Sequence, residues 1–124
     1  MKFAVLDYSY GARSQNAEES VYINIGDNIQ SLAVEYLYAK LGVPFSDIVR
    51  ITTHEVSTYQ GEPVILPLNM FGSKDDIFPC SQSIRPVFIG FNYVSGRCSD
   101  YADYFNHYSP VACRDEYTLD VMKK

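Results

Sequence analysis

The chain has 124 residues, 47% hydrophobic and 20% charged, which is enough for one globular domain with a real core and excludes a disordered chain. Its formal net charge is −5 and it has no basic run, so nucleic acid is excluded as an expected partner, because phosphate neutralisation needs clustered Lys and Arg. Apolar runs are only a few residues long, which excludes a membrane span, and residues 1–7 turn acidic too soon for a signal peptide.

The first half of the chain predicts two strands and one long helix. Residues 2–8 form the first strand, and the polar loop over 9–23 is longer than a usual connection, which favours a functional role for it. A helix is expected over 27–41, and the β-branched segment Ile48–Thr53 predicts the second strand.

The expected helix has clear signals at both ends. Asp27 and Gln30 have the three-residue spacing of a variant capping box, and Gly42 stands where a left-handed C-terminal cap belongs. Between them, apolar residues recur at helical spacing, which indicates an amphipathic helix: Ile29, Leu32, Ala33, Tyr36, Leu37 and Leu41.

The second half alternates strands with shorter helices. Residues 63–68 predict a strand boxed by prolines, and the irregular stretch 69–85 is expected to hold a short helix near Ser81–Ile84. The unbroken apolar run Pro86–Phe91 predicts a strand buried on both faces. Three elements follow: a helix over Asp100–His107, a buried strand over Pro110–Cys113, and a helix over Asp115–Lys124 with Leu119 and Met122 inward.

This alternation predicts one α/β domain over residues 1–124, a Rossmann-like three-layer sandwich with a mainly parallel sheet. Sites in such sheets form at the carboxyl ends of the strands. That edge is expected to gather Asn24–Asn28, Asn69–Phe71, Asn92–Ser95 and the pair Arg114 and Asp115.

The first candidate site is the start of the long helix. Gly26 lets the backbone approach a ligand, and free N–H groups of a helix start can bind a phosphate or carboxylate; the alternative is an ordinary well-capped helix. Asp27 is either a capping residue or a group facing the cleft. Asn24 and Asn28 suit sugar hydroxyls and are explained equally well as turn residues.

The second candidate site is the turn before the last helix. The Arg114 guanidinium can hold a phosphate or carboxylate through two hydrogen bonds, or it can pair with an acidic neighbour. Asp115 fits an N-cap better than a base. His54 and His107 are acid–base candidates, although a surface role is the commoner explanation for such histidines.

Three cysteines, Cys80, Cys98 and Cys113, are too far apart for a close-spaced metal pair, and their odd number argues against a disulfide framework. They are expected to be reduced and mostly buried in a cytoplasmic protein, with Cys113 in the core. No cluster of ligand residues has metal-site spacing, so no metal is predicted.

Two segments in order resemble the polysaccharide pyruvyl transferase family. Residues 24–33, Asn-Ile-Gly-Asp-Asn-Ile-Gln-Ser-Leu-Ala, are similar to that family's Asn-x-Gly-Asp helix start. Residues 109–118 resemble its Gly-x-Arg-Asp-x-x-Thr strand-to-helix motif, except that Ala112 stands near the expected Gly. The resemblance covers nearly the whole chain but only the N-terminal part of a family member.

The resemblance implies one lobe of a B-type glycosyltransferase fold, with the site in a cleft between two lobes. The implied reaction transfers a pyruvyl group from phosphoenolpyruvate to a sugar hydroxyl of a glycan, without another cofactor. The implied substrate-binding residues are Asn24, Gly26, Asp27, Asn28, Arg114 and Asp115. The catalytic acid or base is not identified.

A single lobe is expected to be inactive alone and to self-associate through its exposed edge or its terminal helix, because exposed apolar surface tends to find partners. Two other functions remain open. The chain can be a non-catalytic α/β module that binds a small anion or a protein, or a lobe of a glycosyltransferase that uses a nucleotide sugar.

Overall fold

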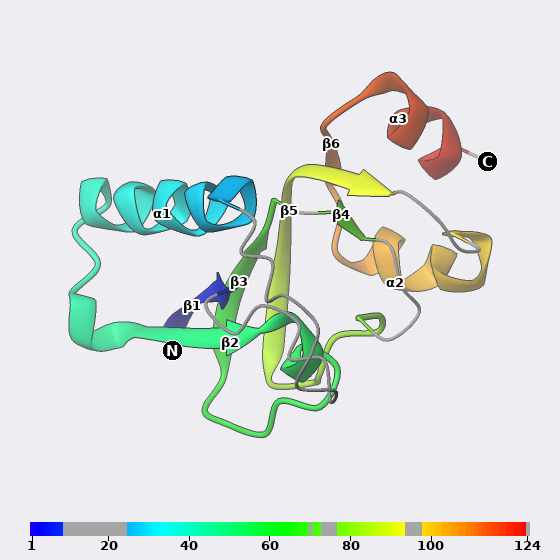
Figure 1. The fold of residues 1–124 in the computed structure, drawn as a ribbon. Helices are drawn as coiled ribbons and strands as arrows, with labels where there is room; N and C mark the ends of the chain where they lie inside the picture. The colour runs from blue at the N-terminus through cyan, green and yellow to red at the C-terminus, as the bar shows by residue number, and fades with distance from the viewer. Residues whose placement is uncertain (9–24, 70, 73–76, 94–97, 124) are drawn as a thin grey trace, which may run out of the picture.

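A computed structural model describes residues 1–8, 25–69, 71–72, 77–93 and 98–123, and the fold is a Rossmann-like α/β sandwich built on a parallel sheet (Figure 1). The strand order is β2-β1-β3-β5, and each of these strands pairs in parallel with its neighbours. Short strands β4 and β6 also pair in parallel with the last part of β5. The strands are β1 (Lys2–Asp7), β2 (Ile48–Thr52), β3 (Val64–Leu68), β4 (Phe71–Gly72), β5 (Ile84–Tyr93) and β6 (Ala112–Cys113). The predicted fold class is thereby confirmed.

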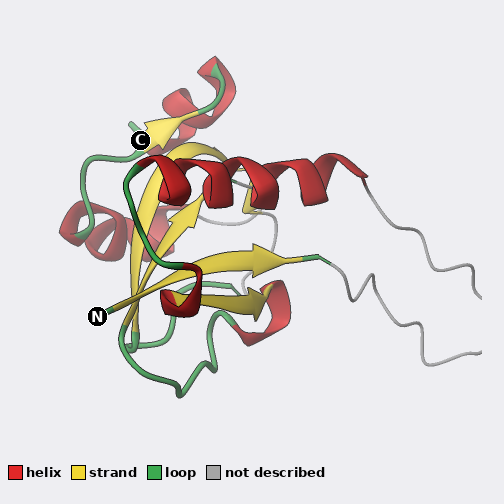
Figure 2. Cartoon of the chain, turned by 90° about the vertical axis from the view of Figure 1, so that its left-hand side faces the viewer, coloured by secondary structure: helices red, strands yellow, loops and turns green. Residues whose placement is uncertain are grey.

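Helices lie on both faces of this sheet. The long helix α1 (Ile25–Lys40) follows β1 and covers one face, running along the strands as Figure 2 shows. The turn η3 (Cys98–Tyr101) and helix α2 (Ala102–His107) pack on the other face, and α3 (Glu116–Met122) follows β6. Two single-turn helices, η1 (Phe45–Asp47) and η2 (Thr53–Glu55), flank β2. None of the helices among these described residues is long and apolar enough to cross a bilayer.

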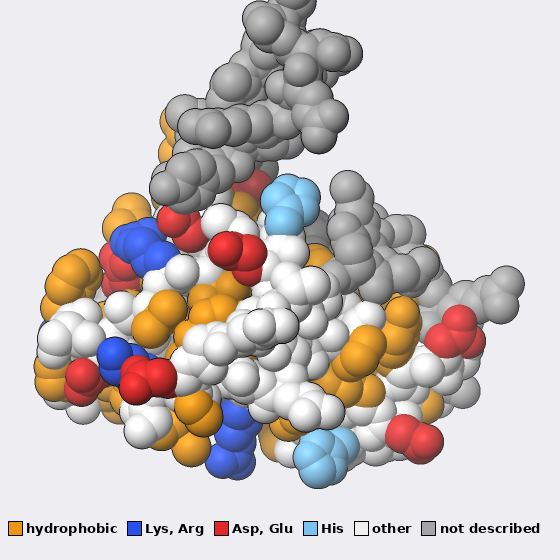
Figure 3. Space-filling view, turned by 90° about the horizontal axis from the view of Figure 1, so that it is seen from below, with side chains coloured by type: hydrophobic (Ala, Val, Ile, Leu, Met, Phe, Trp, Pro, Cys, Tyr) orange, Lys and Arg blue, Asp and Glu red, His pale blue; other side chains and the backbone are white. Residues whose placement is uncertain are grey.

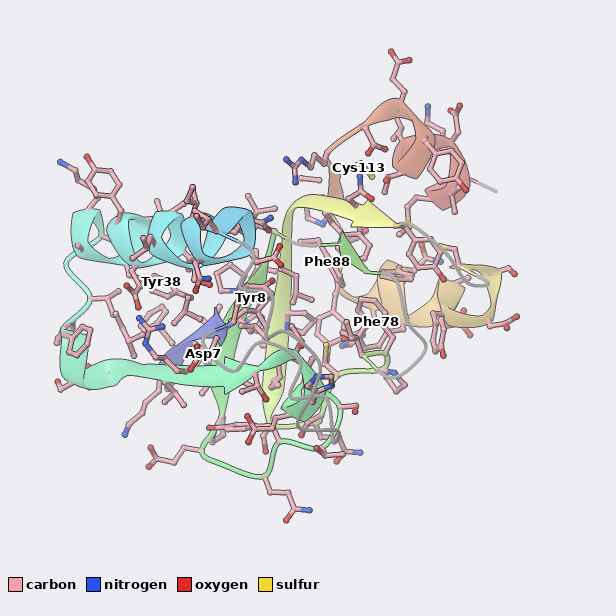
Figure 4. The ribbon with its side chains drawn as sticks, in the orientation of Figure 1. Asp7, Tyr8, Tyr38, Phe78, Phe88 and Cys113 are labelled. Atoms are coloured by element: carbon pink, nitrogen blue, oxygen red, sulfur yellow. The ribbon has the colours of Figure 1, made fainter. Side chains whose placement is uncertain are left out.

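The main core lies on the α2 face and is aromatic. Phe78 sits among the rings, with its centroid 5.3 Å from that of Phe105 and 5.8 Å from that of Phe91 (Figure 4). Phe88 packs against Phe91 at 5.1 Å in an edge-to-face arrangement, the geometry that aromatic pairs favour. These contacts hold the segment between β3 and β5 against the sheet.

The smaller core lies beneath α1. Val34 and Tyr38 of the helix pack on Val5 of β1. The Tyr38 hydroxyl donates to the Ala4 carbonyl at 3.0 Å, and Ser31 donates to the Leu6 carbonyl at 2.5 Å. The inward face of α1 is therefore narrow and partly polar, and its hydrogen bonds fix the helix over β1.

The end of α1 confirms the predicted glycine cap. Gly42 has a φ of 75°, in the left-handed region that favours glycine. Its N–H donates to the Ala39 carbonyl at 3.1 Å, and the Val43 N–H donates to the Tyr38 carbonyl at 2.9 Å. These two bonds form a Schellman motif, which turns the chain toward β2.

Burial differs from the prediction on the α1 face of β5. Val87 and Ile89 are 37% and 44% exposed, whereas Phe88 and Phe91 on the other face are buried. The expectation that Pro86–Phe91 is buried on both faces is wrong, because α1 packs over β1 and β3 and leaves Val87 and Ile89 of β5 partly exposed.

Three smaller expectations are also wrong. The Ser81–Ile84 segment is a turn that leads into β5 and has no helix. Cys113 is only half-buried, because β6 is short and lies at the margin of the sheet. Leu119 is 40% exposed, and Thr118, which is completely buried, takes the inward position on α3.

Candidate functional site at the carboxyl edge

The parallel strands bring both predicted motifs to one edge of the sheet. Gly26–Asn28 belong to the first turn of α1, which follows β1, and Arg114 directly follows β6. Because β1, β3, β5 and β6 all run in the same direction, their carboxyl ends share this edge. Asn24 lies outside the described residues.

The start of α1 differs from the predicted cap. The helix begins at Ile25, so Asp27 lies within the first turn and is not the N-cap. The Gln30 side-chain oxygen is buried and accepts no hydrogen bond from any residue that the structure describes, Asp27 included, so the predicted capping box between Asp27 and Gln30 is not formed. The Gln30 backbone carbonyl instead accepts from Asn69 Nδ2 at 3.2 Å, which ties α1 to the end of β3. A negative side chain in the first turn interacts favourably with the positive end of the helix dipole, and this explains Asp27 without a capping role.

Acidic groups surround this end of the site. Asp7 ends β1 beside Tyr8 (Figure 4), and Glu55 lies in η2 after β2. Burial raises the pKa of the Tyr8 hydroxyl far above its usual value, and the Asp27 carboxylate raises that pKa further. The Thr52 hydroxyl and backbone N–H hold the pKa of Glu55 below its usual range, against the opposing charge of Asp7. The carboxylates of Asp7, Asp27 and Glu55 come from elements that end or begin at this edge, so its β1 end is acidic.

Tyr8 is a functional candidate that the sequence analysis missed. Its hydroxyl is buried and has no hydrogen-bond partner among the described residues, and the nearby Asp27 carboxylate raises its pKa. A phenol with a strongly raised pKa stays protonated at neutral pH and acts as a hydrogen-bond donor. The sequence feature that could have identified Tyr8 is its position directly after the buried strand β1.

In the second motif, Asp115 has a structural role as a helix cap, whereas the side chain of Arg114 lies at the surface. Asp115 is the N-cap of α3: its carboxylate accepts from the Thr118 N–H at 2.7 Å and also from Asn92 Nδ2. The Thr118 N–H is the main cause that lowers the pKa of Asp115, and the charge of Arg114 lowers it further. Asp115 is thus committed to capping, as the sequence favoured.

Arg114 is held by its backbone and leaves its side chain exposed. Its N–H donates to the Phe91 carbonyl at 2.8 Å, which continues the pairing of β6 with β5. The guanidinium therefore lies at the end of the strand ladder, at the solvent-facing edge. It brings a positive charge to the β6 end of an edge whose β1 end is acidic.

The two motifs are separated along this edge. Two to three strand spacings lie between the backbone at the start of α1 and that of β6, which corresponds to about 10–14 Å. The edge is therefore long enough to hold two small ligands side by side.

A hollow of about 440 Å³ lies at the opposite end of the sheet, and the sequence did not predict it. Its lining includes Val64 and Ile84 at the amino ends of their strands, together with Arg85, His107 and Tyr108. Both histidines of the chain are at the surface in Figure 3, which views the amino ends of β3 and β5. His107 stacks edge-on against Tyr108 at 4.6 Å, and His54 lies in η2, so the structure does not bring the two histidines into one site.

The thiols are not arranged for nucleophilic chemistry. Burial raises the pKa of Cys80 to about 11 and also raises the pKa of Cys98 and Cys113, so the reactive thiolate is disfavoured at neutral pH. All three are free. Within the described part of the chain, no three His, Cys, Asp or Glu side chains are grouped so that they could hold a metal ion.

Comparisons with models of protein families, with curated proteins and with solved structures give no match to this chain.

Proposed function

We propose that this chain is the acceptor-side lobe of a polysaccharide pyruvyl transferase-like protein, which transfers a pyruvyl group from phosphoenolpyruvate to a glycan. The observation that carries the proposal is the position of the two motifs: residues 24–33 and 109–118 are far apart in sequence, and their described parts meet at one carboxyl edge. That edge is the usual place for a ligand in a parallel α/β sheet.

The charges divide this edge between the two substrates. The α1 end, with Asp7, Asp27 and the Tyr8 hydroxyl, suits the hydroxyl groups of a neutral sugar, since carboxylates accept hydrogen bonds from them. The Arg114 end suits the carboxylate or phosphate of phosphoenolpyruvate. This division revises the expectation that the helix start binds the anion, because the nearby carboxylates oppose a negative ligand there.

The reaction makes clear what this lobe does not supply. Ketal formation joins two sugar oxygens to C2 of the donor, adds one of their protons to the methylene carbon, and releases phosphate with the other proton. Asp115 is occupied as a cap and Tyr8 stays protonated, so neither is a base for the sugar hydroxyl. Asp7 and Asp27 remain as candidate bases at the sugar end. As the resemblance implies, we assign the rest of the donor site to a second lobe, and the chain alone should then turn over little or no substrate.

The test is to titrate the 124-residue chain separately with phosphoenolpyruvate and with a neutral oligosaccharide while backbone amide shifts are followed by NMR. We expect phosphoenolpyruvate to shift amides around Arg114 and the oligosaccharide to shift amides at the start of α1. Arg114→Gln should abolish the first response and leave the second, because only the anion needs the guanidinium. The matched control, Lys123→Gln, removes another exposed positive charge after α3 and should change neither response.

Two results would count against the proposal. A nucleotide sugar that shifts the Arg114 amides where phosphoenolpyruvate does not would favour the nucleotide-sugar glycosyltransferase. Absence of any response at the carboxyl edge to phosphoenolpyruvate and oligosaccharide would favour the non-catalytic module.

A further inference from the structure

The outward face of α1 is an unusual surface for a helix that packs on a sheet. Four large apolar side chains on it are largely exposed, at 71% for Ile25, 57% for Ile29, 59% for Leu32 and 65% for Tyr36. The face that packs on β1 uses Ser31, Val34 and Tyr38 instead. The helix lies at the outside of the molecule (Figures 1 and 2), and its larger set of apolar side chains is exposed.

These exposed residues form a regular seam. Their positions, continued by Ala39, follow one another at intervals of four, three, four and three residues. This is the spacing of the core positions in a two-helix coiled coil, where each side chain packs between residues of a facing helix. We call Ile25, Ile29, Leu32, Tyr36 and Ala39 the α1 seam.

The charges beside the α1 seam are already occupied within the chain. Glu35 is paired with Arg50 of β2, and its side chain is only 19% exposed. Lys40 lies over the Tyr36 ring with its Nζ 5.2 Å from the centroid. None of the five seam residues is charged, and Lys40 is the cation that lies over one of them, at the C-terminal end of the seam. An identical seam would therefore offer a largely apolar surface to pack against, whereas a highly charged partner would find few complementary groups.

We propose that α1 is a dimerisation helix and that the partner on the α1 seam is a second copy of this chain, related by a two-fold axis. At roughly 100 Å² for each large side chain, with smaller contributions from Ala33, Leu37 and Ala39, each copy would bury about 500 Å². The pair would then bury about 1,000 Å², which is the minimum area expected of a biological interface. The seam begins at Ile25, beside Gly26–Asn28, and runs along α1 away from the carboxyl edge. The proposal does not rest on the proposed function, because it needs only the exposed apolar residues of α1 and no ligand.

The test is sedimentation equilibrium of the intact chain at micromolar concentrations. The parent chain should have twice the 14.1 kDa mass of one copy, and the double variant Ile29→Asp with Leu32→Asp should have the monomer mass. Two buried carboxylates should raise the dissociation constant at least about 100-fold, since each 1.4 kcal/mol is tenfold. Both positions are exposed, so circular dichroism should show an unchanged fold.

A matched control and a cross-link make the test specific. Tyr117→Asp introduces a single carboxylate at an exposed residue outside the seam, on α3, and should leave the dimer intact. Leu32→Cys, at the middle of the seam, should give a disulfide-linked dimer under mild oxidation, well above the parent level. A monomeric parent chain at high micromolar concentration, a double variant that remains dimeric, or dissociation by Tyr117→Asp alone would each overturn the proposal.

Discussion

The two faces of the sheet are covered to different extents, although both are lined by apolar residues. On the α2 face, Phe88 and Phe91 are enclosed by an aromatic cluster, whereas on the α1 face of the same strand Val87 and Ile89 remain partly exposed. Neighbouring residues of β5 are thus all apolar, yet they differ in how far they are buried. The comparison shows that an unbroken apolar sequence allows a strand to be buried on both faces. Which face is actually buried depends on where the helices pack.

The largest expected effect separates these two faces directly. Phe91→Ala should lower the free energy of unfolding by about 3–5 kcal/mol, because it opens a cavity in the aromatic cluster. Ile89→Ala, on the same strand but facing outward, should cost less than about 1 kcal/mol. Urea unfolding of both variants measures the difference, and equal losses would mean that the α1 face of β5 is covered in solution.

Next in size is the contribution of the polar contact beneath α1. Tyr38→Phe removes the hydrogen bond to the Ala4 carbonyl and should cost about 1–1.5 kcal/mol by urea unfolding. Tyr36→Phe removes the same hydroxyl from the outward face and should leave stability nearly unchanged. If the two variants were equally stable, the hydroxyl of Tyr38 would have no role in fixing α1.

A slightly smaller effect is expected where α1 turns toward β2. Gly42→Ala should destabilise the fold by about 1 kcal/mol, since alanine is strained at a φ of 75°. No atom lies within 4 Å of the added methyl position, so steric crowding would not contribute. Thermal unfolding followed by circular dichroism measures the loss, and an unchanged midpoint would contradict the left-handed cap.

The smallest effect concerns α3 and depends on pH. The folded-state pKa of Asp115 is lowered, so its stabilisation is complete above its unfolded pKa of about 4 and is lost as pH falls through the folded value. Asp115→Ala should therefore be less stable than the parent at neutral pH, and this difference should shrink in acid. Asp115→Asn keeps an oxygen acceptor for the Thr118 N–H and should lose less stability at neutral pH. A difference for the alanine variant that stays constant down to strongly acidic pH would contradict a role for the charged carboxylate.

Local signals predicted most of the regular elements. The β-branched segment near Ile48, the apolar run around Phe88 and the glycine after α1 all lie where the sequence placed them. The direction of burial was less predictable, because α1 carries apolar residues on opposite faces. Hydrophobic spacing identified the larger set of apolar residues, around Leu32, which is exposed. The helix packs on the sheet through the smaller set, Val34 and Tyr38.

The candidate site was predicted in part for the same reason. Arg114 and Gly26–Asn28 follow parallel strands, and strand direction alone brings both to the carboxyl edge. The acidic character of the α1 end depends on Asp7 at the end of β1 and Glu55 in η2 after β2, which are far apart in sequence. The burial of the Tyr8 hydroxyl at the same end was not visible in the sequence either.

By itself, the sequence determined the alternation of strands and helices, the cap residues Gly42 and Asp115, and hence a parallel α/β sheet, because these follow from contacts within a few residues. Only the tertiary structure decided which apolar faces are buried, that Asp115 is occupied as a cap while Arg114 reaches solvent, and that the edge is acidic at one end and carries Arg114 at the other. Burial and electrostatic environment depend on which segments meet in space, and this depends on long-range packing that no local pattern contains.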